Sequence, residues 1–304
     1  MEALATNPIQ PALDFATPHH FIDTDQASFA YWKTGTGPDL ALVHGWPLHA
    51  ATYRNVIPHL RHRFTCHLFD LPGAGKTITH SKTQYDLHST AHSFCTAINT
   101  LGISHYGIIA HDSGGAVARV LADIDAEKVT GLVLADTEIP NAHSQLIRSL
   151  ISLGKHPIQF ELFIKLLRFK IVRHSQLGFG GCFHDPQKME GEFYNFFIKP
   201  MLEHPRVLQG QRQLLSAMKL ESINALQQTH QRLNVPVLLL WGANDPFFPL
   251  PEAQKMLSDF KHGEIRVFEE GKLFVQEEFS EAFAEYVGGH FTPLMGAGRT
   301  DARP

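Results

Sequence analysis

The sequence predicts an α/β fold in which a mostly parallel, twisted sheet is flanked by helices, with a helical cap inserted between two parts of the core. Short apolar runs alternate with segments of helical spacing in the first half of the chain, which is typical of parallel strands joined by helices. The alternation stops near residue 138 and resumes near residue 234. The 304 residues, 43% of them hydrophobic and 18% charged, are enough for one large domain with a buried core.

Five apolar runs in the first half are predicted to be strands, because each is short and bounded by turn residues. These runs cover residues 28–32, 39–44, 65–70, 106–111 and 129–135. Between them, apolar residues at helical spacing predict helices over 50–60, 86–101 and 113–124. Strands separated by helices in this way are expected to pair in parallel through crossover connections.

The second half of the chain changes character twice. From 138 to 233 strand-like runs disappear and helical segments such as 144–153 and 161–172 take over, which predicts a cap. A strand at 236–241, a helix at 251–260, a strand at 264–268 and a helix at 280–287 then resume the core pattern. We therefore expect a core made of 25–137 and 234–288, a cap at 138–233, an N-terminal extension at 1–24 and a mobile tail at 289–304.

Composition argues against several classes of partner. A net charge of −4 gives no general electrostatic reason to expect nucleic acid. No uncharged apolar run approaches the roughly 20 residues of a membrane span, and the N-terminus does not resemble a signal peptide. The three cysteines form an odd set without a C-x-x-C pair, which indicates reduced thiols and a cytoplasmic location. The 20 histidines are scattered without ligand spacing, so we expect no metal. We also expect no other cofactor and a small-molecule partner. The sequence leaves the oligomeric state open.

The segment AHDSGG, residues 110–115, predicts a sharp turn between a strand and a helix. A nucleophile on such a turn needs small residues two positions before and two positions after it. Asp112 meets this requirement on both sides, whereas Ser113 would have the bulky His111 two positions before it. Spacing therefore favours Asp112 as the nucleophile, although aspartate is also a good helix cap.

An aspartate nucleophile implies a particular reaction. Attack by Asp112 on an sp³ carbon that bears a halide or an epoxide oxygen gives an ester on the protein, which an activated water must then hydrolyse. Nucleophilic attack by Ser113 would indicate acyl transfer instead.

Two further motifs supply groups that such a reaction uses. HGWP, residues 44–47, follows the second predicted strand, so that the backbone N–H groups of Trp46 and Ser113 can form an oxyanion hole. WGANDP, residues 241–246, follows the strand that restarts the core and places Asp245 where a carboxylate can orient a histidine. Glu138, after the strand at 129–135, is an alternative acid.

A third motif, DLPGAGKT at residues 70–77, ends like a phosphate-binding loop. Such a loop requires glycine five residues before its Gly-Lys pair, and that position is Asp70. We interpret the motif as a structural turn.

The ordered set HGWP, DLPGAG, AHDSGG and WGANDPFFP resembles the epoxide hydrolase and haloalkane dehalogenase branch of the α/β-hydrolase superfamily, over roughly residues 25–290. This resemblance implies an α/β-hydrolase fold with a cap and a hydrolase without a cofactor. It also implies that Asp112 is the nucleophile and Asp245 the acid, with Trp46 and Ser113 as oxyanion-hole donors and a histidine after the last strand as the base.

The sequence departs from this pattern at the base. Residues 269–278 read EEGKLFVQEE, so that Lys272 or Leu273 stands where the histidine is expected. Three hypotheses follow: Lys272 acts as the base after burial lowers its pKa, His290 or His111 comes in from elsewhere, or turnover is lost.

The cap departs as well. Epoxide hydrolases of this branch use two cap tyrosines, whereas the cap has only Tyr194, and dehalogenases commonly have tryptophan where Ser113 stands. We expect a substrate pocket built from His44, His111, Glu138 and Tyr194 beneath an apolar cap rich in phenylalanine. The leading hypothesis is a hydrolase that acts on a small apolar electrophile through an ester on Asp112. The alternatives are a serine-type esterase that uses Ser113 and a ligand-binding relative that does not hydrolyse.

Overall fold

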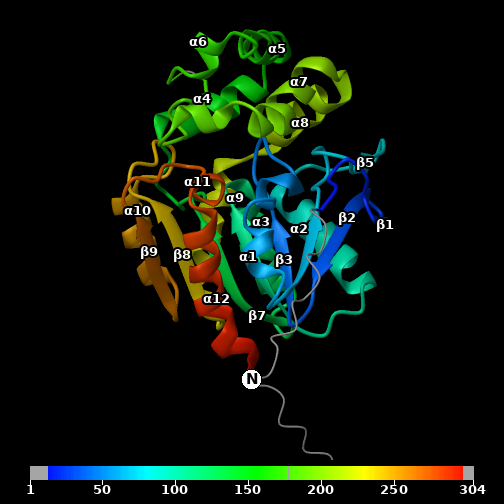
Figure 1. Cartoon of the computed structure of the whole chain (residues 1–304), viewed down its shortest axis with the longest axis vertical. Helices are drawn as coiled ribbons and strands as arrows, with labels where there is room; N and C mark the ends of the chain where they lie inside the picture. The colour runs from blue at the N-terminus through cyan, green and yellow to red at the C-terminus, as the bar shows by residue number, and fades with distance from the viewer. Residues whose placement is uncertain (1–12, 177, 297–304) are drawn as a thin grey trace, which may run out of the picture.

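The computed structural model describes residues 13–176 and 178–296, and its centre is a nine-stranded sheet (Figure 1). The strand order is β1-β2-β4-β3-β6-β7-β8-β9, with β5 paired to β2. Pairing is antiparallel among β1, β2, β4 and β5 and parallel from β4 through β9. The strands are β1 (His20–Asp23), β2 (Ala27–Gly35), β3 (Asp39–Val43), β4 (Thr65–Phe69), β5 (Ile78–Thr79), β6 (Tyr106–His111), β7 (Val129–Ala135), β8 (Val237–Gly242) and β9 (Gly263–Phe268).

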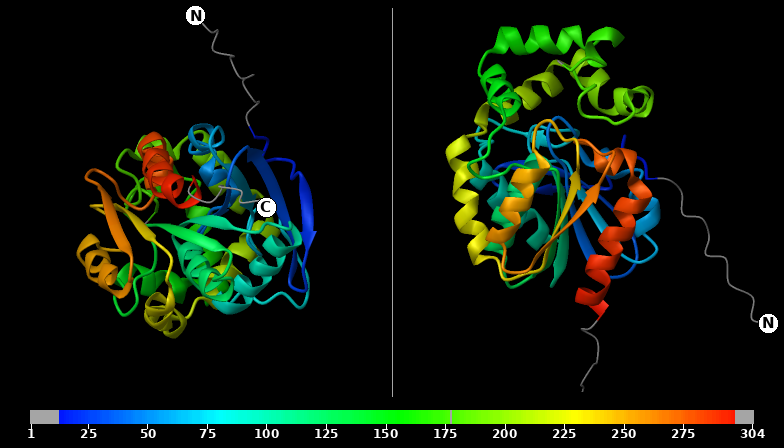
Figure 2. Two further views of the ribbon diagram at one scale, coloured as in Figure 1. Left: turned by 90° about the horizontal axis from the view of Figure 1, so that it is seen from below. Right: turned by 90° about the vertical axis from the view of Figure 1, so that its left-hand side faces the viewer.

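Helices cover both faces of this sheet (Figure 2). The short helix α1 and the long helix α12 lie on one face, and α2, α3, α9 and α10 lie on the other. The central strands are buried on both sides, which explains why they are continuous apolar runs. The core helices are η1 (Ala50–Tyr53), α1 (Ile57–Leu60), α2 (Leu87–Thr100), α3 (Ser113–Ile124), α9 (Leu220–Arg232), α10 (Leu250–Met256), η4 (Leu257–Asp259), α11 (Val275–Glu278) and α12 (Ser280–Gly296).

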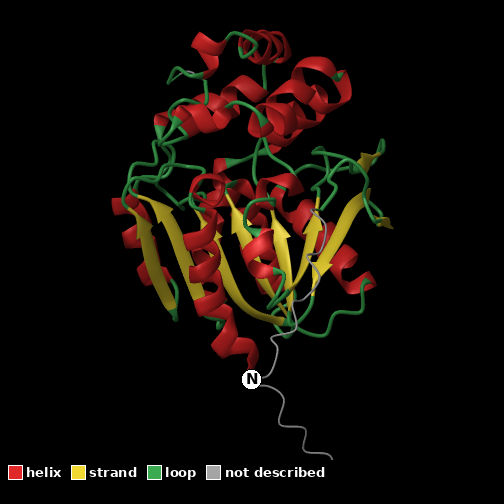
Figure 3. Ribbon diagram, viewed as in Figure 1, coloured by secondary structure: helices red, strands yellow, loops and turns green. Residues whose placement is uncertain are grey.

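The cap is a layer of short helices above the carboxyl ends of the parallel strands (Figure 3). Its helices are α4 (Gln145–Gly154), α5 (Pro157–Leu166), α6 (Lys170–Arg173), η2 (Pro186–Met189), η3 (Tyr194–Ile198), α7 (Lys199–Glu203) and α8 (Pro205–Ala217). The predicted cap boundary at residue 233 needs correction, because α9 packs beside α3 in the core layer. Arg232 of α9 pairs with Asp123 of α3.

Both ends of the core extend further than the sequence predicted. Part of the predicted N-terminal extension belongs to the sheet, since β1 pairs with β2 and the ring of Phe15 lies 5.7 Å from that of Trp32. The tail predicted to be mobile from residue 289 is helical through Gly296, because Phe291 is fully buried and anchors the last turns of α12. Residues 1–12 and 297–304 lie outside the described part of the chain.

Two helices predicted as continuous are broken. The segment 50–60 divides into η1 and α1, with Pro58 in the first turn of α1. The segment 161–172 divides between α5 and α6. Within residues 13–176 and 178–296, no helix is both long and apolar enough to cross a membrane.

Candidate active site

Asp112 occupies the turn that connects β6 directly to α3. Its φ of 50° lies in the left-handed region, which is uncommon for residues other than glycine. The backbone N–H of Asp112 donates to the carbonyl groups of Ala135 and Asp136, which fixes the turn against the neighbouring strand. A Cβ atom at Gly114 would lie 2.3 Å from the carbonyl oxygen of His44, so this position requires glycine. Ser113 is the first residue of the helix.

Two backbone donors hold one oxygen of the Asp112 carboxylate. The N–H groups of Trp46 and Ser113 donate to Oδ1 over 2.8 and 2.5 Å. Among the described residues, Oδ2 accepts no backbone hydrogen bond. Gly45 permits this approach, since a Cβ atom there would lie 2.5 Å from Oδ1. The structure therefore brings Asp112, Trp46 and Ser113 together and leaves Oδ2 for other contacts.

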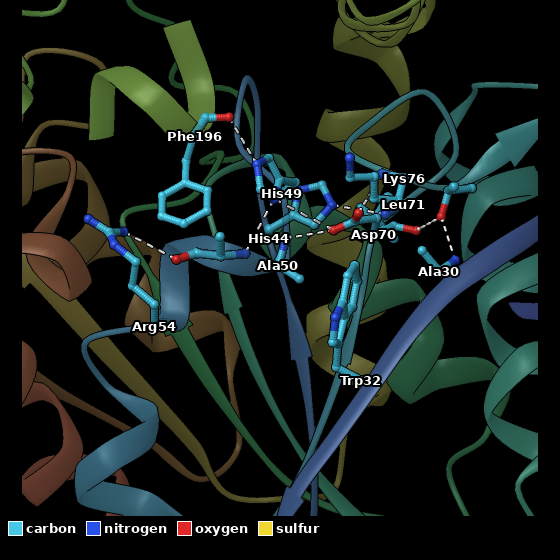
Figure 4. A network of polar contacts seen from close by, with 12 residues as sticks. Ala30, Trp32, His44, His49, Ala50, Arg54, Asp70, Leu71, Lys76 and Phe196 are labelled. Atoms are coloured by element: carbon cyan, nitrogen blue, oxygen red, sulfur yellow. Dashed lines mark hydrogen bonds and ion pairs between the residues drawn. The ribbon is translucent and has the colours of Figure 1, made fainter. Parts of the chain in front are cut away.

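The buried carboxylate of Asp70 bonds to Ala50, as Figure 4 shows, and so holds the end of the loop that carries Trp46. Its Oδ1 accepts from Ala50 N at 2.8 Å and its Oδ2 accepts from Lys76 N at 2.7 Å. A Cβ atom at Gly75 would lie 1.9 Å from Oδ2, so the protein's own carboxylate fills the concavity that a phosphate would need. The motif at 70–77 is thus a structural turn.

His44 belongs to the same network and does not line the substrate pocket, which corrects the prediction. Leu71 N donates to Nε2 of His44, so Nδ1 carries the proton and donates to the carbonyl of Gly45. Burial lowers the pKa of His44 to about 4 and keeps the ring neutral. His49 extends the network to the cap, because its Nε2 lies 3.0 Å from the carbonyl of Phe196 (Figure 4).

A cavity of about 230 Å³ lies between Asp112 and the cap. Its polar wall includes Asp112 and Glu138, and its remaining wall is mostly apolar. A smaller cavity of about 70 Å³ adjoins it and shares Trp46, Glu138 and Met218. The apolar wall includes Trp46, Ile147, Leu150, Phe163, Phe179, Leu215, Phe247, Leu273 and Phe274. Of the cap phenylalanines, Phe163 and Phe179 line the main cavity, whereas Phe183 and Phe193 pack around Phe274.

Asp245 lies in the loop after β8, near a second carboxyl group, Asp136, which the sequence motifs did not indicate. Asp245 Oδ1 accepts from Phe247 N at 2.7 Å, and Asp136 Oδ1 accepts from Gly242 N at 2.8 Å. The charge of Asp245 acts on Asp136, and neither Asp136 Oδ2 nor Asp245 Oδ2 has a hydrogen-bond partner among the described residues. Burial raises the pKa of Asp245 to about 7 and that of Asp136 well above its ordinary value. An aspartate directly after the strand next to β6 was the signal that could have identified Asp136.

Comparison with known proteins assigns the fold to a family. The family model for the alpha/beta hydrolase fold matches residues 40–279. The chain belongs to the alpha/beta hydrolase fold family. Haloalkane dehalogenase 2 of Mycobacterium tuberculosis is 25% identical to this α/β-hydrolase over 266 residues, which are 87% of this chain and 91% of that protein.

Two epoxide hydrolases are also similar to this α/β-hydrolase. Epoxide hydrolase 4 of Homo sapiens is 25% identical over 239 residues, which are 71% of this chain and 62% of that protein. A ligand-free structure of an epoxide hydrolase superposes with a TM-score of 0.74 at 24% identity, and covers 88% of this chain and 96% of the other. These relatives place the chain in the branch that resembles epoxide hydrolases and haloalkane dehalogenases.

None of the candidate bases of this α/β-hydrolase hydrogen-bonds to Asp112 in the described part of the chain. Leu273 lines the cavity, whereas Lys272 is half-buried and is not part of the cavity wall. His290 lies near the amino ends of the parallel strands, away from Asp112 at their carboxyl ends, because its Nδ1 is 3.8 Å from Glu264 at the amino end of β9. The hypothesis that His290 reaches Asp112 is therefore wrong.

His111 has a positioning role. Its Nε2 donates to the carbonyl of Leu273 over 2.8 Å, which fixes the loop after β9. Burial lowers the pKa of His111 to about 4, and the ring does not line the cavity. Tyr194 is also outside the cavity wall, since its ring lies under the guanidinium of Arg173 at 4.8 Å. Of the four predicted pocket residues, the structure places only Glu138 in the cavity wall.

Proposed function

We propose that this α/β-hydrolase acts on small apolar electrophiles through a covalent ester on Asp112. The observation that carries the proposal is the asymmetry of the Asp112 carboxylate, whose Oδ1 is held by two backbone donors while Oδ2 is left for bond formation. The mostly apolar cavity above it would accept a substrate of few carbon atoms.

In the first step Oδ2 attacks an sp³ carbon and displaces a halide or opens an epoxide. In the second step a water attacks Cγ of the ester, and negative charge develops on Oδ1. The N–H groups of Trp46 and Ser113 already point at that atom, so they stabilise the charge without rearrangement. The cavity wall has few polar groups, so we expect it to bind small substrates through their apolar surface.

The geometry supports Asp112 over Ser113 as the nucleophile. The Ser113 hydroxyl accepts from Trp46 N at 3.0 Å, and no histidine among the described residues hydrogen-bonds to it. A serine nucleophile needs such a base to remove its proton, whereas an ionised aspartate does not.

Intact-protein mass spectrometry tests the proposal after incubation with a panel of epoxides, haloalkanes and esters. We expect an alkyl adduct that maps to Asp112 and that is absent from the D112N variant. An acyl adduct on Ser113 would contradict the assignment in favour of an esterase, and bound ligand without any adduct would favour a protein that does not hydrolyse.

A further inference from the structure

We propose that Glu138 donates the proton in the first step at Asp112 and accepts a proton from water in the second, which points to epoxides as the substrate class. This inference rests on the proposed function, because it requires the ester on Asp112. It assigns both the acid and the base of the reaction to one carboxyl group in the cavity wall.

Glu138 lies where the chain leaves the sheet for the cap, three residues after the end of β7. Its side chain is 1% exposed and forms part of the wall of both cavities. Its Oε1 atom has no hydrogen-bond partner in the part of the chain that the structure describes. A buried, unpartnered oxygen at a cavity wall needs a partner, and a substrate oxygen or a water in the cavity would supply one.

The other oxygen of Glu138 is anchored. Thr137 Oγ1 lies 2.9 Å from Oε2, and Arg119 Nη2 donates to that hydroxyl over 3.0 Å. Arg119, fully buried in α3, also donates to the Glu138 carbonyl at 2.9 Å and lies 3.9 Å from Oε2. These contacts fix the carboxyl group and leave Oε1 for chemistry.

The charges around Glu138 allow it to change protonation state during the reaction. Burial, followed by the negative charge of Asp112, raises the pKa of Glu138 to about 7. Near neutral pH the acid form of Glu138 is therefore available. Burial also raises the pKa of Asp112, while the N–H groups of Ser113 and Trp46 stabilise its ionised form. Once Asp112 is esterified its charge is gone, so the pKa of Glu138 falls and the carboxylate form is favoured.

The first step forms a bond from Asp112 Oδ2 to an epoxide carbon and breaks that carbon's bond to the ring oxygen. The electron pair of the broken bond goes to the ring oxygen, which takes the proton from Glu138. The products are a hydroxyalkyl ester on Asp112 and an ionised Glu138.

In the second step Glu138 accepts a proton from a water as the water oxygen bonds to Cγ of Asp112. The tetrahedral intermediate carries its charge on Oδ1, where Trp46 and Ser113 donate. Collapse breaks the bond from Cγ to the alkyl oxygen, which takes the proton back from Glu138 and leaves as a diol. The proton of the regenerated Asp112 acid then returns to Glu138, so that one epoxide and one water give one diol.

Two features favour epoxides over haloalkanes. An opening epoxide leaves an alkoxide that requires a proton, whereas a halide leaves without one. A departing halide instead needs N–H donors, and the indole N–H of Trp46 already donates to the carbonyl of Gln211 at 3.0 Å.

Rapid-quench mass spectrometry on the full chain tests the inference with epoxyhexane and bromohexane. We expect E138Q to slow alkylation of Asp112 by epoxyhexane about 10²-fold and to leave alkylation by bromohexane unchanged, because only the epoxide needs a proton. Decay of the ester formed from either reagent should also slow about 10²-fold. In the native chain, alkylation by epoxyhexane should become slower as the pH rises above the pKa of Glu138.

E277Q is the matched control. Glu277 is also buried with its pKa raised to about 7, but it pairs with Arg54 and Thr52 and does not line the main cavity. Equal slowing of both alkylations by E138Q would show that Glu138 only shapes the cavity and would overturn the inference. If a folded E138Q variant still forms the Asp112 adduct and shows unchanged rates of alkylation and of ester decay, the inference is overturned as well. If neither reagent modifies Asp112 in the native chain, the proposed function itself fails.

Discussion

Two side chains in the cavity wall, those of Asp112 and Leu273, limit the chemistry that the cavity can perform. Asp112 has an unusual backbone conformation and a carboxylate with one anchored oxygen, both typical of a reacting group. Leu273 lines the same cavity and offers no proton acceptor. At the residue scale, the chemistry therefore depends on the carboxyl groups around Asp112.

The L273H variant tests whether an imidazole at this position speeds hydrolysis of the ester on Asp112. The new ring would lie in the cavity wall that also contains Asp112. We expect ester decay on Asp112 to become about 10²-fold faster, in the E138Q background as well. A folded L273H protein whose ester decays no faster would show that a base at this position does not reach the ester.

The pair of Asp136 and Asp245 should give stability an unusual pH dependence. Burial raises the pKa of Asp245 to about 7 in the folded chain, so this carboxyl is protonated there while it is ionised in the unfolded chain. The folded state thus binds more protons, and its stability should fall as the pH rises from about 4 to about 7. Urea titrations across this range should show a smaller decrease for D245N, because an amide cannot ionise. Equal pH slopes for both proteins would contradict the raised pKa of Asp245.

Sequence could identify these residues only in part. The small residues around Asp112 predicted the turn, because that geometry excludes larger side chains. In contrast, the directions of the His44 and His111 rings depend on contacts with Leu71 and Leu273, which are distant in the chain. Spacing within a motif carries no information on such contacts.

At the scale of elements, α3 links the turn at Asp112 to two other parts of the fold. These are the segment at Thr137 and Glu138, where the chain leaves the sheet for the cap, and the helix α9. Arg119 of α3 donates to His230 of α9, whose pKa burial lowers to about 2, so that the neutral ring accepts. The same guanidinium holds Thr137 and Glu138. The positions of Thr137 and Glu138 therefore depend on the buried side chain of Arg119, which lies between α3 and α9.

Removing Arg119 should destabilise the fold strongly. In R119M the contacts of Thr137, Glu138 and His230 lose their shared donor, and we expect the free energy of unfolding to fall by about 3–5 kcal/mol in urea titrations. R232M is the control, since Arg232 also joins α9 to α3 but its side chain is 54% exposed. That change should lower stability by at most about 1 kcal/mol. Similar losses in the two variants would argue against a special role for the buried contacts.

The helix α9 also shows why boundaries are harder to predict than elements. Its sequence has helical spacing like that of the cap helices before it, so periodicity alone assigned it to the cap. Its place in the core depends on Asp123 and Arg119 of α3, which lie about a hundred residues earlier. The central strands, in contrast, are buried on both faces, and their apolar runs located β6 and β7 at their observed bounds.

At the scale of the whole molecule, the cap completes a cavity that the sheet alone would leave open. The floor contributes Asp112 and Leu273, and α4 and α5 contribute Leu150 and Phe163. The size of this cavity should therefore limit the size of the electrophile.

Filling the cavity from the cap tests this limit. L150W should reduce alkylation of Asp112 by a long-chain epoxide at least about tenfold more than alkylation by a short-chain one, because the extra ring takes space from the longer chain. I158W is the control, since Ile158 in α5 is 81% exposed and is not in the cavity wall. If L150W slows the two epoxides equally, as measured by adduct formation, substrates do not bind in this cavity.

The most direct test of the ester on Asp112 is peptide mapping by mass spectrometry after reaction with an epoxide in heavy-oxygen water. We expect the peptide that contains Asp112 to carry the alkyl group when the reaction is quenched early, and to contain heavy oxygen after turnover, because water attacks Cγ. The corresponding D112N peptide should carry neither. Diol formed with heavy oxygen while the Asp112 peptide remains unmodified and unlabelled would contradict covalent catalysis by Asp112.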